Sequence, residues 1–546
     1  MKVKSFILFI LGGMLITQSA WAAQAIQSPQ EYLPADTSKD KNGEIIASMP
    51  KPAILDEASA KFYLEKISVK SSFDDDIRKV RLYKILKKYE KQETNIKGLN
   101  SAVSEVTDFY RKNGFPAATA YLPPQKSQNG VIEIAVELGK YSRISVENNS
   151  GVKTDIINKM ASCLHQGDIV RGKQLETVLN NIIDLGGIRA GGFMRPGDAV
   201  GETELIIRVE GGQRESYVLY SENYGSKSSG RYRYGLLANF NEMAGLGEHI
   251  GINASLSNEQ QHNYGVQYDQ MIAGNGTRAG INISKTDYEL GSHYSSAGAV
   301  GQATTVGLYG ITPVWKTSSS KLLVNYGWDY RKLKDELRDF DYSVEKHSNS
   351  FRLGVSGTER LPKTAIAYDF TMYYGHLTGD NAHVGNIPLT VASEGNYSKA
   401  LFNANIVRSL DKQWDIFVKL QAQQASNNLD SSEQINLGGA NGVRAYPQGE
   451  GSGDEGYQAT AELRYHTKVP GLILSSYFDV GHVKYTKNDL VPGGTTLKGW
   501  GIGVSWNEAN GFWARFDYAR RIGLAKDATN DAKSKQRMWF IVGKSW

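Results

Sequence analysis

Short segments in which apolar and polar residues alternate strictly fill the chain from about Gln213 to Trp546. In residues 499–506, four large apolar side chains alternate with glycine and serine, and residues 457–465 and 512–518 repeat the pattern with charged residues. Because successive side chains of a strand point to opposite faces, each segment has one apolar face and one small or charged face. The alternation predicts β-strands over this whole region.

The length of this region helps to choose between two kinds of β-structure. It covers about 330 residues, which is unusually long for a soluble sandwich, and at roughly 20 residues per strand and connection it gives about 16 strands. Lipid cannot satisfy the backbone groups of an open sheet edge, so such a sheet must close. We expect a mainly β protein with an antiparallel transmembrane β-barrel of about 16 strands. Its apolar face contacts outer-membrane lipid, and its charged face, with Glu462 and Arg464, lines a lumen.

Composition agrees with a large β-structure that has many turns. The 546 residues include 57 Gly and 30 Tyr, and the mean hydropathy of −0.41 excludes a bundle of membrane helices. The formal net charge of +5 is small for this length and does not indicate a nucleic-acid partner. The single cysteine, Cys163, excludes an internal disulfide framework and is expected to be a buried, apolar side chain.

The first residues predict the compartment. Lys2 and Lys4 precede an apolar stretch over residues 5–16, and Ala20-Trp21-Ala22 provides a cleavage site, so residues 1–22 are expected to be a secretory signal peptide. An uncleaved anchor is the alternative. The mature protein is then expected outside the cytoplasm, where ATP is not available. Residues 23–60 are polar and contain four prolines, which interrupt any long helix, so they are expected to form a linker.

Between the linker and the strands, two modules of similar length share one order of elements. In the first, a strand is expected over 62–70, a charged helix over 74–92, a second helix from Leu99 to Tyr110 that Gly114 ends, and strands over 117–121 and 131–137. The same order returns with a strand over 141–147, helices from about 154 and over 175–182, and strands over 188–194 and 203–209. We predict tandem α+β modules over residues 61–140 and 141–212 and a barrel over 213–546.

No sequence motif indicates catalysis. Residues 167–174 nearly match a phosphate-binding loop, but Gln174 stands where a Ser or Thr would hold Mg²⁺. The nine histidines form no metal-ligand spacing, and no Ser or Cys nucleophile motif occurs. We therefore expect a protein that is not an enzyme and has no catalytic residues, metal or cofactor.

Motifs in the barrel region resemble those of one family. Residues 438–447 are similar to the VRGY-type loop of the TpsB family, the transporters of two-partner secretion, and residues 478–481 resemble its F-x-D-x-G strand. The motif residues are Val443, Arg444, Tyr446, Phe478, Asp479 and Gly481. Two positions depart from the family pattern, because Ala445 replaces a loop glycine and Lys544 stands where an apolar residue is usual in the barrel-assembly signal.

The two predicted modules look like the family's two periplasmic POTRA domains. The first carries a turn similar to Y-R-x-x-G-[YF] and a second turn similar to L-P-x-Q, with Tyr110, Arg111, Gly114, Phe115, Pro116 and Gln125. The resemblance implies that this module captures the N-terminal secretion domain of a partner. Family members often begin with a helix that plugs the pore, for which the proline-interrupted stretch 23–60 is a poor candidate.

The resemblance implies an outer-membrane translocator, with periplasmic POTRA domains, of a Gram-negative-type bacterium. It would secrete a large TpsA-type exoprotein through the lumen without nucleotide hydrolysis, with barrel assembly machinery as a partner during biogenesis. An insertase of the same superfamily is the alternative, and a passive porin would not explain the two modules. Neither the identity nor the activity of the exoprotein follows from the sequence.

The sequence also predicts one specific contact in the lumen. In residues 472–483, Phe478 shares a face with other apolar residues, so Asp479 points into the lumen. Arg444 lies in a loop rich in glycine, which is long enough to fold back inside the barrel. By resemblance to the superfamily, Arg444 would anchor the loop on Asp479. The alternative is an exposed loop arginine and an aspartate that faces water.

Overall fold

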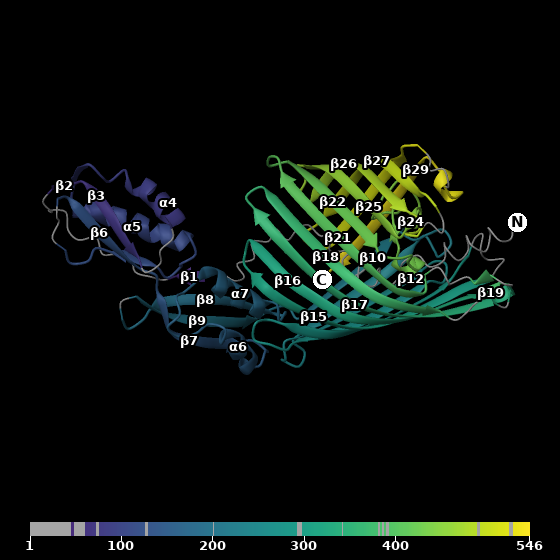
Figure 1. Ribbon diagram of the computed structural model, residues 1–546, viewed down its shortest axis with the longest axis horizontal. Coiled ribbons are helices and arrows are strands. Elements are labelled where there is room, and N and C mark those ends of the chain that lie inside the picture. The colour runs from purple at the N-terminus through teal and green to yellow at the C-terminus, as the bar shows by residue number, and fades with distance from the viewer. Residues whose placement is uncertain are drawn as a thin grey trace.

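In the computed structural model, the described residues are 45–47 and 61–546, apart from 72–75, 126–128, 200, 292–297, 341, 380–382, 385–386, 389–392, 489–491 and 524–527. The expected signal peptide and most of the expected linker therefore lie outside them. Within the described ranges, no helix is both long enough and apolar enough to cross a membrane. Two small α+β modules lie beyond one end of a large barrel (Figure 1).

The barrel is closed, and its sixteen strands are antiparallel and follow chain order. The first and last strands, β10 (Glu215–Glu222) and β29 (Gln536–Ser545), pair from Val218–Ser545 to Glu222–Ile541 and close the ring. The predicted fold class is thus confirmed. The other strands are β11 (Arg233–Asn241), β12 (Glu248–Ser257), β13 (His262–Met271), β14 (Arg278–Glu289), β15 (Ala299–Lys316), β16 (Ser320–Leu337), β17 (Tyr342–Leu361), β18 (Thr364–Gly379), β21 (Gly395–Ser409), β22 (Trp414–Ala425), β25 (Glu455–His466), β26 (Leu472–Lys484), β27 (Gly494–Asn507) and β28 (Phe512–Arg521).

Side chains alternate between the outside and the inside of the barrel as the sequence pattern requires. Ile502 and Phe516 are exposed on the outer surface, whereas Asp517 is buried inside. Lys544, which departs from the family pattern, places its ammonium 4.7 Å from the ring centre of Phe512 and 5.1 Å from that of Trp546. A cation over aromatic rings is stabilised where the membrane surface meets water, so the lysine is compatible with this position.

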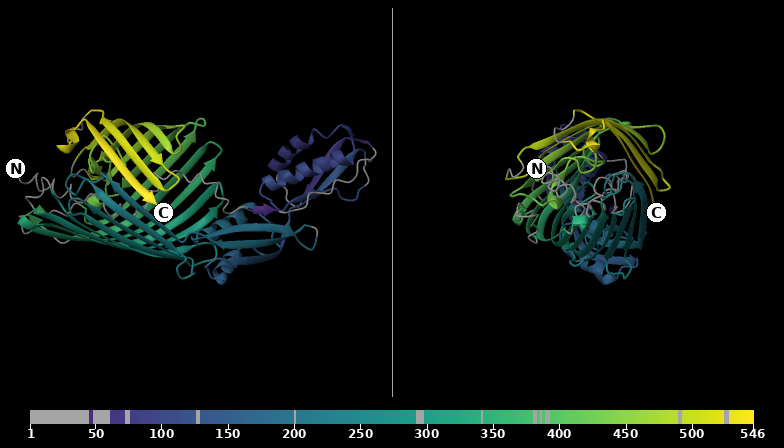
Figure 2. Two further views of the ribbon diagram at one scale, coloured as in Figure 1. Left: turned by 180° about the vertical axis from the view of Figure 1, so that it is seen from behind. Right: turned by 90° about the vertical axis from the view of Figure 1, so that its right-hand side faces the viewer.

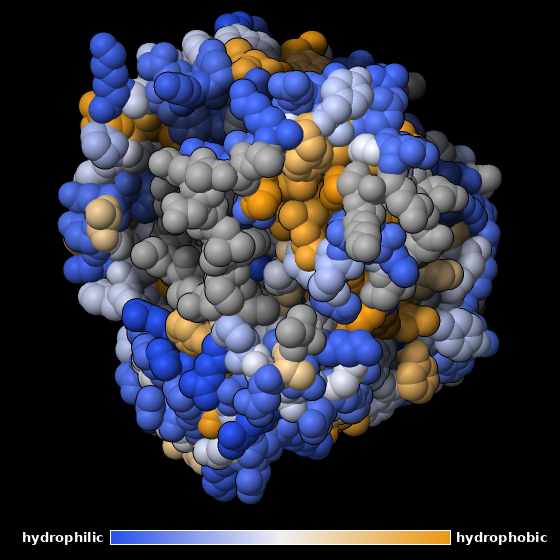
Figure 3. Space-filling view, turned by 90° about the vertical axis from the view of Figure 1, so that its left-hand side faces the viewer, coloured by the Kyte–Doolittle hydropathy of each residue, from blue (hydrophilic) through white to orange (hydrophobic). Residues whose placement is uncertain are grey.

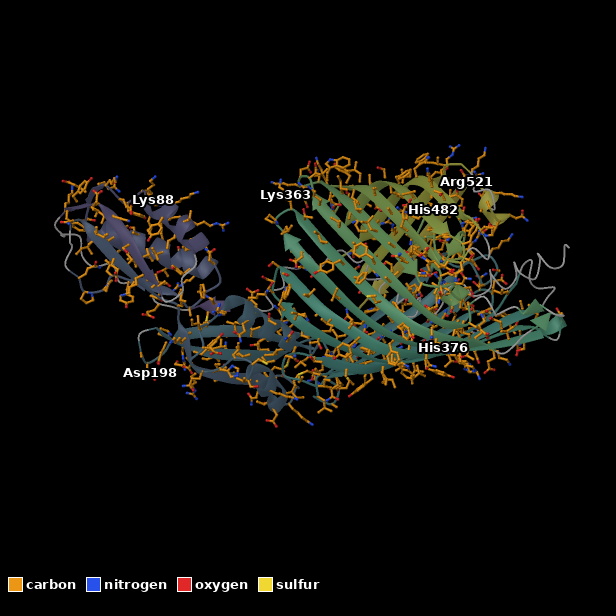
Figure 4. All side chains as sticks on the ribbon, in the orientation of Figure 1. Lys88, Asp198, Lys363, His376, His482 and Arg521 are labelled. Atoms are coloured by element: carbon orange, nitrogen blue, oxygen red, sulfur yellow. The ribbon has the colours of Figure 1, made fainter. Side chains whose placement is uncertain are left out.

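Short turns face the modules, and long loops lie at the opposite end of the barrel. Figure 4 labels Lys363 in the β17–β18 turn at the rim near the modules, and Arg521 and His482 toward the other end. Strands β15 to β18 are the longest and extend farthest from the modules, as both side views show (Figures 1 and 2). Small elements in the loops are η2 (Arg338–Phe340), β19 (His383–Val384), β20 (Ile387–Pro388), η3 (Ser431–Glu433), β23 (Ile435–Asn436), β24 (Ser452–Gly453) and η4 (Asp531–Lys533).

The first module has its own core. Its elements are β2 (Phe62–Leu64), β3 (Lys66–Ser71), α4 (Asp76–Leu86), β4 (Gln92–Thr94), α5 (Ile96–Lys112), β5 (Thr119–Tyr121) and β6 (Val131–Glu137). Helix α5 buries Leu99, Val103 and Val106 against the sheet β3-β6-β5, and ends before Gly114, whose φ is +99°. The expected helix 74–92 is too long, because Lys91 adopts a φ of 57° and donates its N–H to the carbonyl of Leu64, which turns the chain into β4.

The second module repeats the order of elements with a separate core. It contains β7 (Lys140–Asn149), α6 (Thr154–Ala161), α7 (Gly172–Ile183), β8 (Ile188–Pro196) and β9 (Glu202–Gly211). Cys163 is partly buried and packs against this core. Inside the stretch expected to be a linker, residues 45–47 form β1 (Ile45–Ala47), which pairs in parallel with β8. An outer strand has backbone groups available for such pairing, so this part of the stretch is ordered.

Helix α7 docks the second module onto the barrel. Along one side of the helix, Asn180 donates to the carbonyl of Lys316 (3.0 Å), Glu176 accepts from the N–H of Ser318 (3.0 Å), and Asp184 pairs with the Lys316 ammonium. These contacts fix the β15–β16 turn to the module. Seen from the module end, the molecule has a mainly hydrophilic surface with scattered hydrophobic areas (Figure 3).

Candidate functional site: a loop anchored inside the barrel

The connection between β22 and β25 turns back into the lumen as a hairpin. Strands β23 and β24 form its stem, which continues through the N–H of Leu437 to the carbonyl of Gly451 (3.1 Å) and that of Gly438 to Glu450 (2.8 Å). The tip, residues 438–450, includes the VRGY-like motif. We call residues 426–454 the lumen loop. Its tip lies against the inner faces of the last barrel strands, as the contacts below show.

Arg444 and Asp479 form the ion pair that the sequence analysis expects. The Arg444 Nη2 atom lies 2.8 Å from Asp479 Oδ1, and Nε lies 3.0 Å from Oδ2. The backbone N–H of Arg444 also donates to Oδ2 (3.1 Å), so one carboxylate binds both the side chain and the main chain of the loop tip. Both residues are buried, with 5% and 1% of their surface exposed. This geometry is the bidentate arrangement that lysine cannot reproduce.

The arginine meets more carboxylates than the sequence indicated. Its Nη1 atom lies 3.3 Å from Asp517 Oδ1 and 3.5 Å from Glu462 Oε2, and its guanidinium lies over the ring of Tyr477. Burial acts to lower the pKa of Arg444, but the charges and hydrogen bonds of Asp479 and the charge of Asp517 raise it above its ordinary value. The guanidinium therefore stays charged inside the barrel. Asp517 lies on the charged face of a strand with alternating residues, and this pattern could have indicated from the sequence that its carboxylate points into the lumen.

The expected lumen charges are part of this network. Glu462 accepts from the Arg515 guanidinium (3.2 Å), and Arg464 Nε lies 3.3 Å from Glu462 Oε1. Arg515 also binds Asp517 through Nε (2.7 Å). The cluster thus alternates acids and bases, which compensates the cost of burying each charge.

Packing fixes the rest of the motif. Val443, Ala445 and Tyr446 are fully buried in an apolar cluster inside the barrel. A Cβ atom on Gly499 would lie 2.5 Å from the Ala445 methyl group, so the strand glycine leaves the space that the loop alanine fills. This contact explains how the alanine replaces the usual loop glycine. Tyr446 therefore anchors the loop by burial.

The strand motif around Asp479 places two residues, Asp479 and Gly481, on the inner side of the wall and Phe478 on the outer side. Gly481 faces inward, where a Cβ atom would lie 2.7 Å from Leu437 of the loop stem. Phe478 is exposed on the outer surface, so it contributes to the membrane-facing side and not to the lumen. The motif thus combines a lumen acid, a close approach of the loop, and an outer aromatic residue.

Sequence reasoning missed the contact of the loop with the closing strand. The indole N–H of Trp539, on β29, donates to the carbonyl of Arg444 (2.6 Å). Its ring packs edge-on against Tyr224, which follows β10, with ring centres 6.0 Å apart. The loop tip therefore contacts the seam between the first and last strands. The alternation of residues along β29 indicates that Trp539 faces inward, but it does not indicate that the indole binds the carbonyl of Arg444.

The motif residues of the first module lie mainly in its interior. Tyr110 and Phe115 are buried, and Arg111 Nε donates to the carbonyl of Ala118 (2.9 Å). Gln125 is exposed in the connection between β5 and β6, and binds β6 by donating to the carbonyl of Glu133 and accepting from its N–H. Pro116 is half-buried in the same turn.

The turn around Gly114 is a joint between the modules. Its carbonyl accepts the N–H of Gly172 (3.0 Å), the first residue of α7 in the second module. The Arg171 guanidinium lies 5.9 Å from the ring centre of Phe115 across the same joint. Most of these motif residues therefore shape and connect the modules, and Gln125 has the exposed side chain among them.

The architecture and the anchored loop define a class of protein. A sixteen-stranded barrel with two α+β modules beyond one end, the second of them docked on the barrel, and a charged loop tip fixed in its lumen is an outer-membrane transporter of two-partner secretion. Residues 201–506 match the family described as haemolysin secretion/activation protein ShlB/FhaC/HecB, and residues 64–139 match the ShlB-type POTRA domain. The chain belongs to this haemolysin secretion/activation family.

Relatives and solved structures agree with this assignment. The chain is 26% identical over 500 residues to the heme/hemopexin transporter protein HuxB of Haemophilus influenzae, covering 89% of this chain and 87% of HuxB. Its fold is similar to CdiB from Escherichia coli (TM-score 0.70, 18% identity, 97% and 98% of the two chains) and to CdiB from Acinetobacter baumannii (TM-score 0.65, 16% identity, 97% and 98%). The barrel thus lies in the outer membrane with the POTRA modules in the periplasm, and the alternative of an insertase is not favoured.

Proposed function

We propose that the protein captures one large exoprotein with its POTRA modules and exports it, unfolded, through the barrel lumen. The observation that carries this proposal is the lumen loop, which crosses a path lined by charged side chains in a barrel on which the second module is docked. A loop held by side-chain contacts can leave this path without breaking the barrel wall. Lipid contacts the apolar outer face, and barrel assembly machinery inserts the barrel during biogenesis.

Capture uses the backbone edges of the modules. Strand β3 is an outer strand of the sheet in the first module, and β7 is an outer strand in the second. An extended segment of the exoprotein can pair with such an edge through main-chain hydrogen bonds. This mode does not need the buried motif side chains, whose role is to build the modules and their joint.

Export proceeds without catalysis or nucleotide hydrolysis. Folding of the exoprotein outside the cell supplies the drive, because a folded domain cannot return through the lumen. Tyr288, Asp335 and the other interior polar groups serve as pore lining, with hydrogen bonds such as the one from the Tyr288 hydroxyl to Asp335 (2.6 Å).

Deletion of residues 61–140 tests the role of the first module. Its core is separate from that of the second module, so the remaining chain is expected to assemble a barrel with unchanged heat-modifiable mobility. The first candidate for the exoprotein is the product of the neighbouring gene. Its secretion should be lost in the deletion variant. Lys88→Ala, on the exposed face of the same module, is the matched control. Normal secretion by the deletion variant would refute capture by this module.

A further inference from the structure

A second cluster of buried charges holds the lumen loop near its base. Glu433 lies in the short helix η3, and both of its carboxylate oxygens are bound: Lys399 Nζ lies 2.6 Å from Oε2, and the Tyr397 hydroxyl and the Arg331 guanidinium reach Oε1. Its carbonyl also accepts from Lys399 (3.0 Å) and from Gln423 (2.9 Å). The side chain and the main chain of the loop are therefore both fixed to the wall.

Asp430 adds a separate contact. Its Oδ2 atom accepts from Lys346 Nζ (2.6 Å), and its Oδ1 atom accepts from the N–H of Ser432, which caps η3. Asp430, Glu433 and Lys346 are all buried, with less than a tenth of their surface exposed. We call Asp430, Glu433 and their basic partners Lys346, Lys399 and Arg331 the base anchor, and Arg444 with its carboxylates the tip anchor.

The two anchors use opposite charges on different groups of strands, whose nearest members, β21 and β25, have only β22 between them. At the base, acids on the loop meet bases on β16, β17 and β21, whereas at the tip a base on the loop meets acids on β25, β26 and β28. In the ring of sixteen strands, β16 and β28 are eight positions apart. A reversed loop would bring Arg444 toward the bases of the base anchor and take Asp430 and Glu433 away from them. The charge pattern therefore admits one orientation of the loop across the lumen.

The position of each anchor in the hairpin assigns it a role. The base anchor precedes the stem and lies close to β22, and Gln423 of β22 also donates to the carbonyl of Asp454 at the other foot of the hairpin (3.1 Å). If the base alone came free, the tip would still hold the loop across the lumen. If the tip alone came free, residues 438–450 could swing about the base. Only release of the tip clears the path.

We propose that Asp430 and Glu433 are positioning residues that form a fixed pivot, about which the tip carrying Arg444 swings aside. The link to export rests on the proposed function, but the pivot itself can be tested without an exoprotein. The probes are a membrane-impermeant maleimide, applied from outside to a tip cysteine, and KCl conductance in planar bilayers. Replacing the single cysteine (Cys163→Ala) gives the background for both.

The first test measures the freedom of the tip. With Gln448→Cys as the reporter and Arg444→Ala, which releases the tip, as the parent, Glu433→Gln leaves Arg331 and Lys399 facing a neutral group, and maleimide labelling is expected to quicken by a further factor of roughly ten because the freed loop loses its pivot. With the tip still held by Arg444, the same change should leave the labelling rate unaltered. Glu345→Gln, which removes an ion pair with Lys332 on the same two strands away from the loop, is the matched control and should label at the parent rate. The exchanged pair Asp430→Lys with Lys346→Asp should label more slowly than either single variant. If Glu433→Gln does not change the labelling rate of the Arg444→Ala parent, the proposal is overturned.

The second test separates two roles of the base anchor: a pivot, which stays closed while the tip moves, and a gate, which must itself open. A disulfide between Asp430→Cys and Lys346→Cys holds the base closed, so for a pivot the oxidised protein should keep the channel openings of its reduced form. A disulfide between Ala445→Cys and Gly499→Cys, which lie in contact, holds the tip and should abolish those openings. Unchanged heat-modifiable mobility shows that each variant is folded. If oxidation of the base pair abolishes the openings, the base must open and the pivot is refuted, whether or not export follows the proposed route.

Discussion

Arg444 of the lumen loop and Asp479 of β26 face each other fork to fork, with two side-chain contacts of 2.8 and 3.0 Å inside the barrel. The same carboxylate also accepts the backbone N–H of Arg444. One wall residue therefore determines both where the loop tip lies and how its main chain is oriented.

Removing either partner should loosen the tip strongly. Because a buried charge would lose its counter-charge, Arg444→Ala and Asp479→Ala are each expected to cost about 3 kcal/mol of loop anchoring and to reduce secretion sharply. Arg444→Lys should restore only part of the loss, since it cannot form the bidentate contact. A double-mutant cycle on barrel heat stability should show coupling between the two residues. Strictly additive losses would contradict a direct pair.

Trp539 should contribute through a single hydrogen bond. Trp539→Phe keeps an aromatic ring beside Tyr224 but removes the donor to the Arg444 carbonyl, so heat stability should fall by about 1 kcal/mol. Trp513→Phe is the control, because its indole bonds to Ser545 at 3.3 Å and not to the loop. Equal effects on maleimide labelling of the loop tip in both variants would show that Trp539 has no special link to it.

Gly481 should tolerate no side chain. In Gly481→Ala the new methyl group would lie 2.7 Å from Leu437, and the stem of the lumen loop would have to move. Overpacking of this kind costs about 1–3 kcal/mol, which a thermal melt of the barrel can measure. Gly211→Ala, where no atom lies within 4 Å of the added carbon, is the matched control. The double variant Gly481→Ala with Leu437→Ala should recover part of the loss.

The junction of the barrel and the second module should respond to pH. Burial, and then the charge of Glu248, raise the pKa of Glu242 in the β11–β12 turn to about 7 from an ordinary value of 4.5, while Arg278 and Arg214 act in the opposite direction. The folded protein thus binds this proton more tightly than the unfolded chain. Stability should fall as pH rises from about 4.5 to about 7, by at most about 3 kcal/mol, and remain lower above it.

Glu242→Gln tests this dependence, because an amide cannot ionise. The variant should melt at a higher temperature than the parent at pH 8 and at a similar temperature at pH 4.5. Glu508→Gln, in an exposed turn on the same side of the barrel, is the control and should leave the pH profile unchanged. A parent profile that is flat between pH 4.5 and 8 would refute a buried protonated carboxyl at this junction.

The sequence by itself determined the elements and the direction of their side chains. Alternation along β25 to β28 depends only on the two-residue period of a strand, so it predicted the strands and the inward direction of Asp479, and the length of the region predicted about 16 of them. The apolar stripe of α5 and the glycine after it gave the helix and its end in the same way. These features depend on neighbours in the chain, which is why they could be predicted.

Only the tertiary structure decided which inward-facing groups meet. Asp517 and Trp539 are 73 and 95 residues from Arg444 in the chain, yet both bind it, because closing the ring brings the last strands beside the loop. The base anchor joins Glu433 to β16 and β21 for the same reason. Strand periodicity gives the side of the wall on which a residue lies, but contacts across a lumen depend on barrel closure and on the path of the loop, which no local pattern encodes.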